Sequence, residues 1–271
     1  MKILILGATG FLAQNIVMSC LGSGYDITVS SRQLQVPKLN NFILLDELLM
    51  LESVSYDVVI NGIVSYDSET CFDVNYSLSK LIFDKLDKKS LKMYITFDTF
   101  FSKYIDLCPK VEYARSKCLF NSYLSLQKAS TFGIFNIILE HLYGPLDSVS
   151  KFIPMVIDNL KNNRVTALTD CLNERDFVYV KDLVDFVQYL LQHPERGYHS
   201  FEFGTGHAVS VKEFLNSVVD IYGGEGLLNF GVSDYSASLD RSCADTSYLK
   251  SKFNWTCSYD ITRGLLDLSN E

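Results

Sequence analysis

The sequence predicts an α/β fold with a doubly wound parallel sheet, followed by a smaller C-terminal α/β lobe. Three observations lead to this prediction. The chain opens with a wholly apolar run at Ile3 to Leu6, a glycine-rich turn follows it directly, and strand-like and helix-like segments alternate behind it. A strand that is apolar throughout is typical of a parallel sheet covered on both faces. Alternating strands and helices connect parallel strands through right-handed crossovers.

The individual elements follow from apolar periodicity and from the turns that separate them. We expect strands at Ile3 to Leu6, Ile27 to Ser30, Phe42 to Leu45, Val58 to Ile60, Met93 to Thr96 and Asn136 to Leu139. We expect helices at Phe11 to Leu21, Cys71 to Leu86 and Tyr113 to Lys128. This order is typical of an open sheet with helices on both faces.

The rhythm changes after Tyr143-Gly144-Pro145, where short strand-like pieces separate the expected helices. These helices are expected at Phe152 to Leu160, Lys181 to Leu191 and Val211 to Tyr222. We therefore expect residues 1–145 to form a dinucleotide-binding domain, joined by a returning segment from 170–205. Residues 146–271 are expected to form mainly a substrate-binding lobe.

The composition limits the classes of protein to which the chain can belong. A hydrophobic content of 48% supplies a large core, and a net charge of -8 disfavours nucleic acid as a partner. The seven cysteines are scattered and form no C-x-x-C pair, so the sequence predicts neither a disulfide framework nor a metal site. The N-terminal apolar run is too short for a signal peptide, and no stretch is long enough to span a membrane. The cytoplasm is the expected location.

The glycine-rich turn at Gly7 to Ala13 joins the first strand to a helix. Glycines there permit a tight turn and let the backbone approach a pyrophosphate, while the helix N-terminus offers N–H groups to the phosphates. An ordinary strand-to-helix turn is the alternative, and the βαβ rhythm behind the turn favours a Rossmann-type cofactor site. The expected cofactor contacts in the turn are Gly7, Thr9, Gly10, Phe11 and Leu12.

The end of the second strand indicates which cofactor binds. An acidic residue there would bind a ribose 2′-hydroxyl, but this chain has Ser31 and Arg32, which suit a 2′-phosphate. The sequence therefore favours NADP(H) over NAD(H), with a solvated surface arginine as the alternative interpretation. Asp46, after the third strand, is a further candidate cofactor contact.

Tyr113 and Lys117 stand four residues apart and share one face of a predicted helix. A free phenol has a pKa of about 10. A neighbouring ammonium and an oxidised nicotinamide would lower the pKa of Tyr113, so that it exchanges a proton with a ketone or alcohol oxygen. An exposed, unrelated pair is the alternative. The position of the pair after the glycine turn and the fifth strand favours catalysis.

Motifs from almost end to end of the chain resemble those of the extended short-chain dehydrogenase/reductase family, the epimerase/dehydratase group that acts on nucleotide sugars. They lie at Asp73-Val74-Asn75, Leu142-Tyr143-Gly144-Pro145, residues 175–180 (R-D-F-V-Y-V), residues 203–206 (F-G-T-G), Ala244-Asp245-Thr246-Ser247 and Trp255. The resemblance implies that Tyr113 and Lys117 are catalytic and contact the cofactor, and that Arg175 contacts a nucleotide diphosphate. A structural ion pair is the alternative for Arg175.

The chain departs from the family pattern at the end of the fifth strand. Phe97 stands where the family has a catalytic Ser or Thr, and Thr99, two residues on, is the candidate replacement. The Asp-Glu pair of the family's dehydratases reads Asp98-Thr99, which argues against dehydration. With Glu140-His141 before the Y-G-P motif, the chain looks most like the CDP-abequose and paratose synthase type of reductase, and His141 becomes a candidate substrate contact.

The predicted function is NADPH-dependent reduction of a nucleotide-linked 4-keto-6-deoxy sugar. Hydride comes from the nicotinamide and the proton comes from Tyr113. Lys117 adjusts the pKa of Tyr113 and binds the ribose. A nucleotide-sugar epimerase with tightly held NAD(P) is one alternative. A catalytically silent NAD(P)-binding sensor or scaffold is the other, and Phe97 keeps it open. By family analogy, a homodimer would form through the helices at Cys71 to Leu86 and Tyr113 to Lys128.

Overall fold

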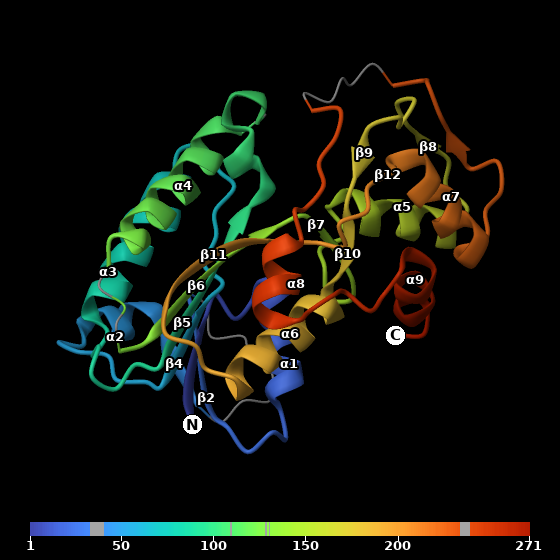
Figure 1. Cartoon of the computed structure of the whole chain (residues 1–271). Coiled ribbons are helices and arrows are strands. Elements are labelled where there is room, and N and C mark those ends of the chain that lie inside the picture. The colour runs from blue at the N-terminus through green and yellow to red at the C-terminus, as the bar shows by residue number, and fades with distance from the viewer. Residues whose placement is uncertain (33–40, 109, 128, 130, 234–238) are drawn as a thin grey trace. The chain divides into compact units, whose positions relative to one another are not determined.

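The computed structural model describes residues 1–32, 41–108, 110–127, 129, 131–233 and 239–271, and it divides into two compact units (Figure 1). The first unit comprises Met1–Ile138 and Val184–Phe201, and the second comprises Leu139–Leu183 and Glu202–Glu271. The first unit therefore ends before the Y-G-P motif rather than at residue 145. The returning segment is also shorter than the expected 170–205, because residues before Val184 pair within the second unit.

The first unit is built on a seven-stranded sheet among the described residues, in the order β11-β6-β5-β4-β1-β2-β3. The strands are β1 (Lys2–Leu6), β2 (Asp26–Ser31), β3 (Phe42–Leu44), β4 (Val58–Asn61), β5 (Met93–Thr99), β6 (Gly133–Leu139) and β11 (Gly197–Phe203). β1 pairs in parallel with both β2 and β4, so Leu6 lies between Ser30 and Asn61. This is the predicted doubly wound parallel sheet. Its carboxyl-terminal edge gathers the ends of β2, β1 and β4.

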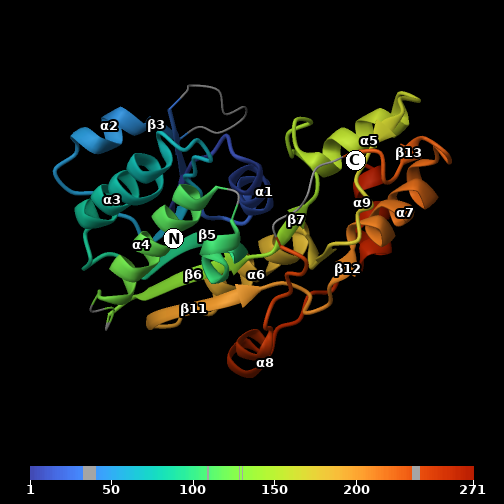
Figure 2. The ribbon, with the colours of Figure 1, turned by 90° about the horizontal axis from the view of Figure 1, so that it is seen from above.

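Helices cover both faces of this sheet (Figures 1 and 2). On one face lie α2 (Leu45–Met50), α3 (Ser79–Lys85) and α4 (Val111–Ser125), and on the other lie α1 (Phe11–Cys20) and the part of α6 (Val180–Gln192) that belongs to this unit. Buried apolar side chains of α2, α3 and α4 share one core with strand residues such as Leu4, Val59 and Tyr94. On the opposite face, the Gln188 amide of α6 donates to Ser19 Oγ of α1.

One predicted helix has an irregular first half. The segment predicted as a single helix from Cys71 to Leu86 begins with a π-helical stretch, η1 (Asp73–Leu78), and continues as α3. The stretch carries the buried Asn75, whose side chain accepts from Ser65 N (2.8 Å) and donates to Ser116 Oγ of α4 (3.0 Å). Asn75 therefore ties the loop after β4 to the helix that carries Tyr113 and Lys117.

The second unit is made of short strand pairs and helices. β7 (His141–Tyr143) pairs in parallel with β10 (Phe177–Tyr179), β9 (Glu174–Arg175) pairs antiparallel with β12 (Val209–Ser210), and β8 (Thr166–Ala167) pairs with β13 (Leu228–Asn229). The helices are α5 (Phe152–Lys161), α7 (Val211–Tyr222), α8 (Ser247–Phe253) and α9 (Ile261–Ser269). No helix within the described ranges is long and apolar enough to cross a membrane.

The core of the second unit is aromatic. The Phe177 and Phe214 rings stack with their centroids 4.0 Å apart, and Tyr143 packs edge-on against Phe214 at 5.2 Å. The buried Asp176 accepts from Gly206 N (2.9 Å) and from Thr205 N (3.0 Å) and Oγ1 (2.5 Å). This carboxylate therefore joins the R-D-F-V-Y-V motif to the F-G-T-G turn and fixes the backbone beside Arg175.

Candidate active site

The glycine turn is built for a backbone that must approach a ligand closely. Gly7 has a positive φ of 72°, and a Cβ at this position would lie 2.7 Å from the Gly62 carbonyl oxygen. The N–H groups of Gly7 and Ala8 donate to the Ser30 carbonyl at 2.9 and 3.2 Å. The N-cap residue of α1 is Gly10, which has no side chain that could cap the helix. The helix end is therefore open to an anion.

A cavity of about 210 Å³ lies at this end of the sheet in the first unit. Five predicted cofactor contacts line it: Gly7, Thr9, Gly10, Ser31 and Arg32. Phe11 and Leu12 lie in the first turn of α1 and Asp46 is exposed in the first turn of α2, and these three predicted residues are not part of the lining. The neighbour of Asp46, Leu45, lines the cavity instead.

Ser30, the other hydroxyl at the end of the second strand, also lines the cavity. The sequence analysis missed the remaining lining residues: Leu45, Gly62, Ile63, Val64, Val74 and Leu78. Three of them follow β4, and the adjacent pairing of β4 with β1 brings their loop to the glycine turn. Loops that follow neighbouring parallel strands meet at one edge of the sheet. The residues after β4 could therefore be predicted as part of the cavity only from the order of the strands.

The lining fits a dinucleotide. A Cβ at Gly7 would collide with the backbone of Gly62 and Ile63, so a glycine is required for the turn to lie against the loop after β4. Ser30 Oγ is buried and has no hydrogen-bond partner among the described residues, and Arg32 is exposed. A hydroxyl and a guanidinium are donors that suit the phosphate and ribose oxygens of a nucleotide.

Tyr113 and Lys117 lie on α4, and Thr99 ends the neighbouring strand β5. Lys117 is buried and its Nζ donates to the Phe97 carbonyl at 3.0 Å. Burial lowers the pKa of Lys117 to about 8, and the nearby Asp98 acts in the opposite direction. The Thr99 side chain forms a hydrogen bond with the Tyr113 phenol. The structure thus brings the three predicted catalytic residues together within the first unit.

The expectation that a neighbouring cation lowers the pKa of Tyr113 is wrong for the chain alone. Burial raises this pKa well above its ordinary value, and the nearby Tyr66 and Asp98 raise it further, while the Thr99 hydrogen bond acts against them. The Lys117 ammonium donates instead to the Phe97 carbonyl. Tyr113 is therefore a neutral phenol near pH 7, the form that can donate a proton to a ketone oxygen.

Phe97 takes part in the site through its backbone. Its side chain is buried, and its carbonyl accepts the Lys117 hydrogen bond. Tyr66, which sequence reasoning missed, packs on the other side of the phenol with its ring centroid 4.9 Å from that of Tyr113. No pattern in the sequence marks Tyr66, because it comes from the loop after β4.

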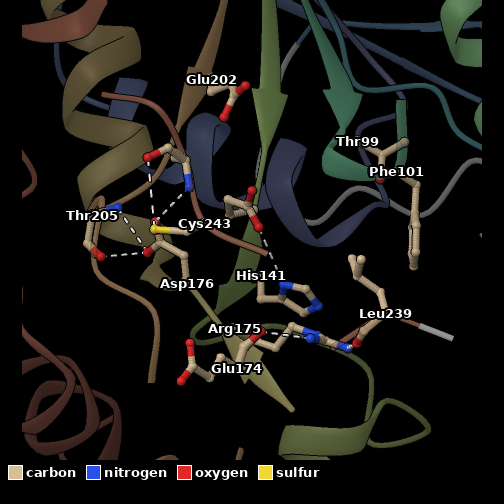
Figure 3. A network of polar contacts seen from close by, with 12 residues as sticks. Thr99, Phe101, His141, Glu174, Arg175, Asp176, Glu202, Thr205, Leu239 and Cys243 are labelled. Atoms are coloured by element: carbon tan, nitrogen blue, oxygen red, sulfur yellow. Dashed lines mark hydrogen bonds and ion pairs between the residues drawn. The ribbon is translucent and has the colours of Figure 1, made fainter. Parts of the chain in front are cut away.

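Arg175 and His141 lie in the second unit (Figure 3). The Arg175 guanidinium donates to the carbonyls of Glu174 (2.7 Å), Leu239 (2.7 Å) and Asp240 (3.3 Å). Burial lowers the pKa of His141, whose Nδ1 lies 3.8 Å from the Glu140 carboxylate. These carbonyl oxygens orient the guanidinium, whose planar fork has the geometry to donate to phosphate oxygens.

No group of His, Cys, Asp and Glu residues in the described parts of the chain has the arrangement of a metal site.

Fold and site together define an NAD(P)-dependent oxidoreductase of the extended short-chain dehydrogenase/reductase type. The sheet carries the glycine turn after its first strand and the Tyr113–Lys117 pair on the helix after β5. The chain belongs to the NAD-dependent epimerase/dehydratase family, whose model matches residues 3–204.

Individual relatives agree with this assignment. The chain is 26% identical over 280 residues to the CDP-abequose synthase of Salmonella muenchen, covering 97% of this chain and 95% of the relative. It is also 26% identical to the CDP-abequose synthase of Salmonella typhimurium, over 98% and 96% of the two chains.

Solved structures share the fold at low sequence identity. The UDP-glucose 4-epimerase of Thermotoga maritima, solved with UDP-glucose, has a TM-score of 0.84 and 17% identity, covering 100% of this chain and 98% of its own. The Bordetella bronchiseptica enzyme WbmG, in complex with NAD, has a TM-score of 0.81 and 20% identity, covering 100% and 93%.

Proposed function

We propose that this protein is an NADPH-dependent reductase that acts on a nucleotide-linked 4-keto-6-deoxy sugar. The observation that carries the proposal is the placement of Tyr113, whose phenol is hydrogen-bonded by Thr99 and which lies on the same helix as the buried Lys117. Similarity to CDP-abequose synthases over nearly the whole chain supports this substrate class, as do the D-T-F-F and E-H-L-Y-G-P segments.

Each group has a defined task in the proposed reaction. A bound NADPH supplies the hydride that reduces the keto carbon. Tyr113 donates its proton to the ketone oxygen, so that the carbonyl becomes a secondary alcohol. Lys117 stabilises the phenolate that remains and binds the cofactor ribose. Thr99 orients the carbonyl in place of the hydroxyl that Phe97 lacks.

The second unit is proposed to hold the nucleotide diphosphate. Arg175 supplies a cation that carbonyl oxygens orient, and His141 supplies a neutral imidazole. A guanidinium binds phosphate oxygens through two parallel hydrogen bonds, whereas a neutral imidazole adds a donor without a further charge.

NADPH oxidation with a panel of CDP-, dTDP-, GDP- and UDP-linked 4-keto-6-deoxy sugars tests the function. A reductase consumes one NADPH for each sugar reduced. Conversion of a nucleotide sugar without net NADPH oxidation would support the epimerase alternative. Cofactor binding without turnover of any sugar in the panel would support the silent sensor.

The cofactor preference rests on Arg32 and Ser31 in the cavity lining. We predict that NADPH binds more tightly than NADH, by roughly tenfold or more, since a charge-assisted pair contributes about 1.5–3 kcal/mol. Arg32→Asp should narrow or reverse this preference, because the new carboxylate repels a 2′-phosphate and accepts from a 2′-hydroxyl. Fluorescence titration with both cofactors measures the change. Lys89→Asp, a charge reversal at an exposed turn, is the control, and equal affinities in the parent protein would contradict the assignment.

A homodimer is proposed through the segment from Cys71 to Leu86 and α4. Large apolar side chains are exposed there, with Phe72 at 45%, Leu81 at 46% and Leu119 at 45%. A protein–protein contact would bury this apolar surface. Light scattering should show a dimer that Leu81→Lys combined with Leu119→Lys converts to a monomer, while Met50→Lys on the exposed face of α2 leaves it dimeric. A monomeric parent protein would refute the proposal.

A further inference from the structure

A buried carboxylate lies in the middle of the candidate catalytic residues. Asp98 on β5 is only 4% exposed, and it stands between Phe97 and Thr99. Its Oδ1 accepts from Thr99 N (2.7 Å) and from Ser102 Oγ (2.5 Å). Its Oδ2 is buried and has no hydrogen-bond partner among the described residues. A buried carboxylate with an unsatisfied oxygen needs a compensating charge nearby.

The compensating charge comes from α4. Lys117 Nζ is buried and donates to the carbonyl of Phe97, the residue directly before Asp98. The charge of Asp98 also raises the pKa of Tyr113 and of Cys118 on the same helix, and that of Tyr198 on β11. The polar neighbours Asn136 of β6 and Ser102 of η2 (Phe100–Lys103) complete the surroundings. Among these groups Lys117 is the cation, so Asp98 and Lys117 form the opposed charges of this buried cluster.

The position of Asp98 in the chain links it to the proposed chemistry on both sides. The residue before it holds Lys117 through a carbonyl oxygen. The residue after it, Thr99, has its N–H fixed by the Asp98 carboxylate and its side chain bonded to the Tyr113 phenol. A carboxylate that binds the amide of the next residue holds that part of the strand in one conformation.

We infer that Asp98 is a positioning residue that holds the end of β5 in place and supplies the negative charge facing the Lys117 ammonium. The inference rests on the proposed function only where it concerns turnover, because the charge pairing is a property of the free protein. Asp98 touches no reacting atom in this scheme and acts through Lys117 and Thr99. Of the Asp-Glu pair that the family's dehydratases carry, this chain therefore has only the aspartate, and that aspartate positions its neighbours.

The expected effect on Lys117 has a definite sign. Burial lowers the pKa of Lys117 to about 8, whereas the charge of Asp98 raises it. Removing that charge should let the pKa of Lys117 fall below 8. The ammonium would then be lost at a lower pH, and turnover that needs it would decline at a lower pH as well. Since Asp98 is itself buried, its own pKa is raised, and the two groups titrate as a coupled pair.

The test measures the ionisation of Lys117 in the cofactor-free protein by NMR, with lysine labelled at the ε-carbon and Lys117→Arg used to assign its signal. Asp98→Asn keeps the shape of the side chain and removes its charge. In the Asp98→Asn variant we expect the titration midpoint of Lys117 to fall by about one pH unit, because a close opposite charge has been removed. Asp106→Asn removes a charge from an exposed position of the same unit and is the matched control.

A Lys117 midpoint that stays near 8 in a folded Asp98→Asn variant would overturn the inference. If that variant does not fold, the reciprocal measurement decides. Lys117→Met should then raise the pKa of the Asp98 carboxyl, followed by carboxyl-carbon NMR, and an unchanged Asp98 titration would overturn the inference equally. A shifted midpoint in a protein that reduces no sugar would leave the charge pairing intact and refute only the proposed function.

Discussion

Tyr113→Phe is expected to lower the rate of sugar reduction by about 100-fold or more, while NADPH still binds. The phenol is the group that Thr99 engages, and its raised pKa keeps the proton in place near neutral pH until the ketone oxygen takes it. Phenylalanine keeps the ring and its contact with Tyr66 but has no proton to donate. Initial rates at saturating NADPH, together with the cofactor dissociation constant, measure the effect.

Two further variants distinguish the proton donor from the residues that position it. Thr99→Val should lower the rate of sugar reduction less than Tyr113→Phe does, because Thr99 only orients the carbonyl and the phenol. Thr96→Val should change the rate of sugar reduction little, since Thr96 is buried earlier in β5 and is not among the groups that affect the phenol. Undiminished turnover in Tyr113→Phe would refute the proposed mechanism. A loss of NADPH binding in that variant would instead assign Tyr113 a binding role.

Turnover should also decline as the pH rises through about 8. Burial brings the pKa of Lys117 to about 8, so its ammonium is present below that pH and is lost above it. Tyr113, with a pKa raised above its ordinary value, remains protonated across the same range. The alkaline limb of the pH profile therefore reports Lys117.

Arg175→Ala is expected to raise the KM for the sugar nucleotide by about 10- to 100-fold, with a smaller change in kcat and none in NADPH affinity. A hydrogen bond to a charged group contributes about 1.5–3 kcal/mol, which corresponds to this range. The guanidinium is oriented by the carbonyls of Leu239 and Glu174, so the alanine variant loses both the charge and its orientation. Steady-state kinetics and a thermal melt of each variant provide the measurements.

Two further variants make the Arg175 result specific. Arg241→Ala removes a neighbouring arginine that is paired with Glu174 at 2.7 Å, and it should leave KM nearly unchanged. Arg175→Lys keeps a charge but loses the planar fork, so it should recover only part of the binding. A drop in melting temperature with an unchanged KM in Arg175→Ala would show that the arginine serves the fold alone.

The sequence anticipated the parts of the fold that carry a strong local signal. The apolar run of β1 and the glycine turn predicted the central strand and its phosphate-facing edge, since both depend on short-range patterns. The spacing of Tyr113 and Lys117 likewise predicted their shared helix. The wholly buried β5 extends to Thr99 rather than ending at Thr96, as apolar runs mark a strand but not its last residue.

Other features depend on contacts that no local pattern contains. α2 has six residues, too few to show helical periodicity, and Leu45 was assigned to the preceding strand. β11 alternates buried His199, Phe201 and Phe203 with more exposed residues, and this period of two is the local signal of the strand. The cofactor-cavity residues after β4 and the Tyr66 contact follow from strand order, which the sequence alone does not specify.

The raised pKa of Tyr113 illustrates the same limit for the site. The four-residue spacing shows that a lysine is near, but it does not show that Lys117 Nζ donates to the Phe97 carbonyl or that burial dominates. Burial of both side chains is a tertiary property. In the structure without cofactor, the pKa of Tyr113 therefore lies above that of a free phenol, whereas the sequence predicted a pKa below it.

The most direct test of the central claim follows the hydride itself. The protein is incubated with a nucleotide 4-keto-6-deoxy sugar and NADPH that carries deuterium at the transferable position of the nicotinamide, and the sugar product is analysed by mass spectrometry and NMR. The account predicts one deuterium on the former keto carbon for each NADPH oxidised, with at least a 100-fold slower appearance of label in Tyr113→Phe. A sugar product formed without deuterium at that carbon, or without NADPH oxidation, would contradict it.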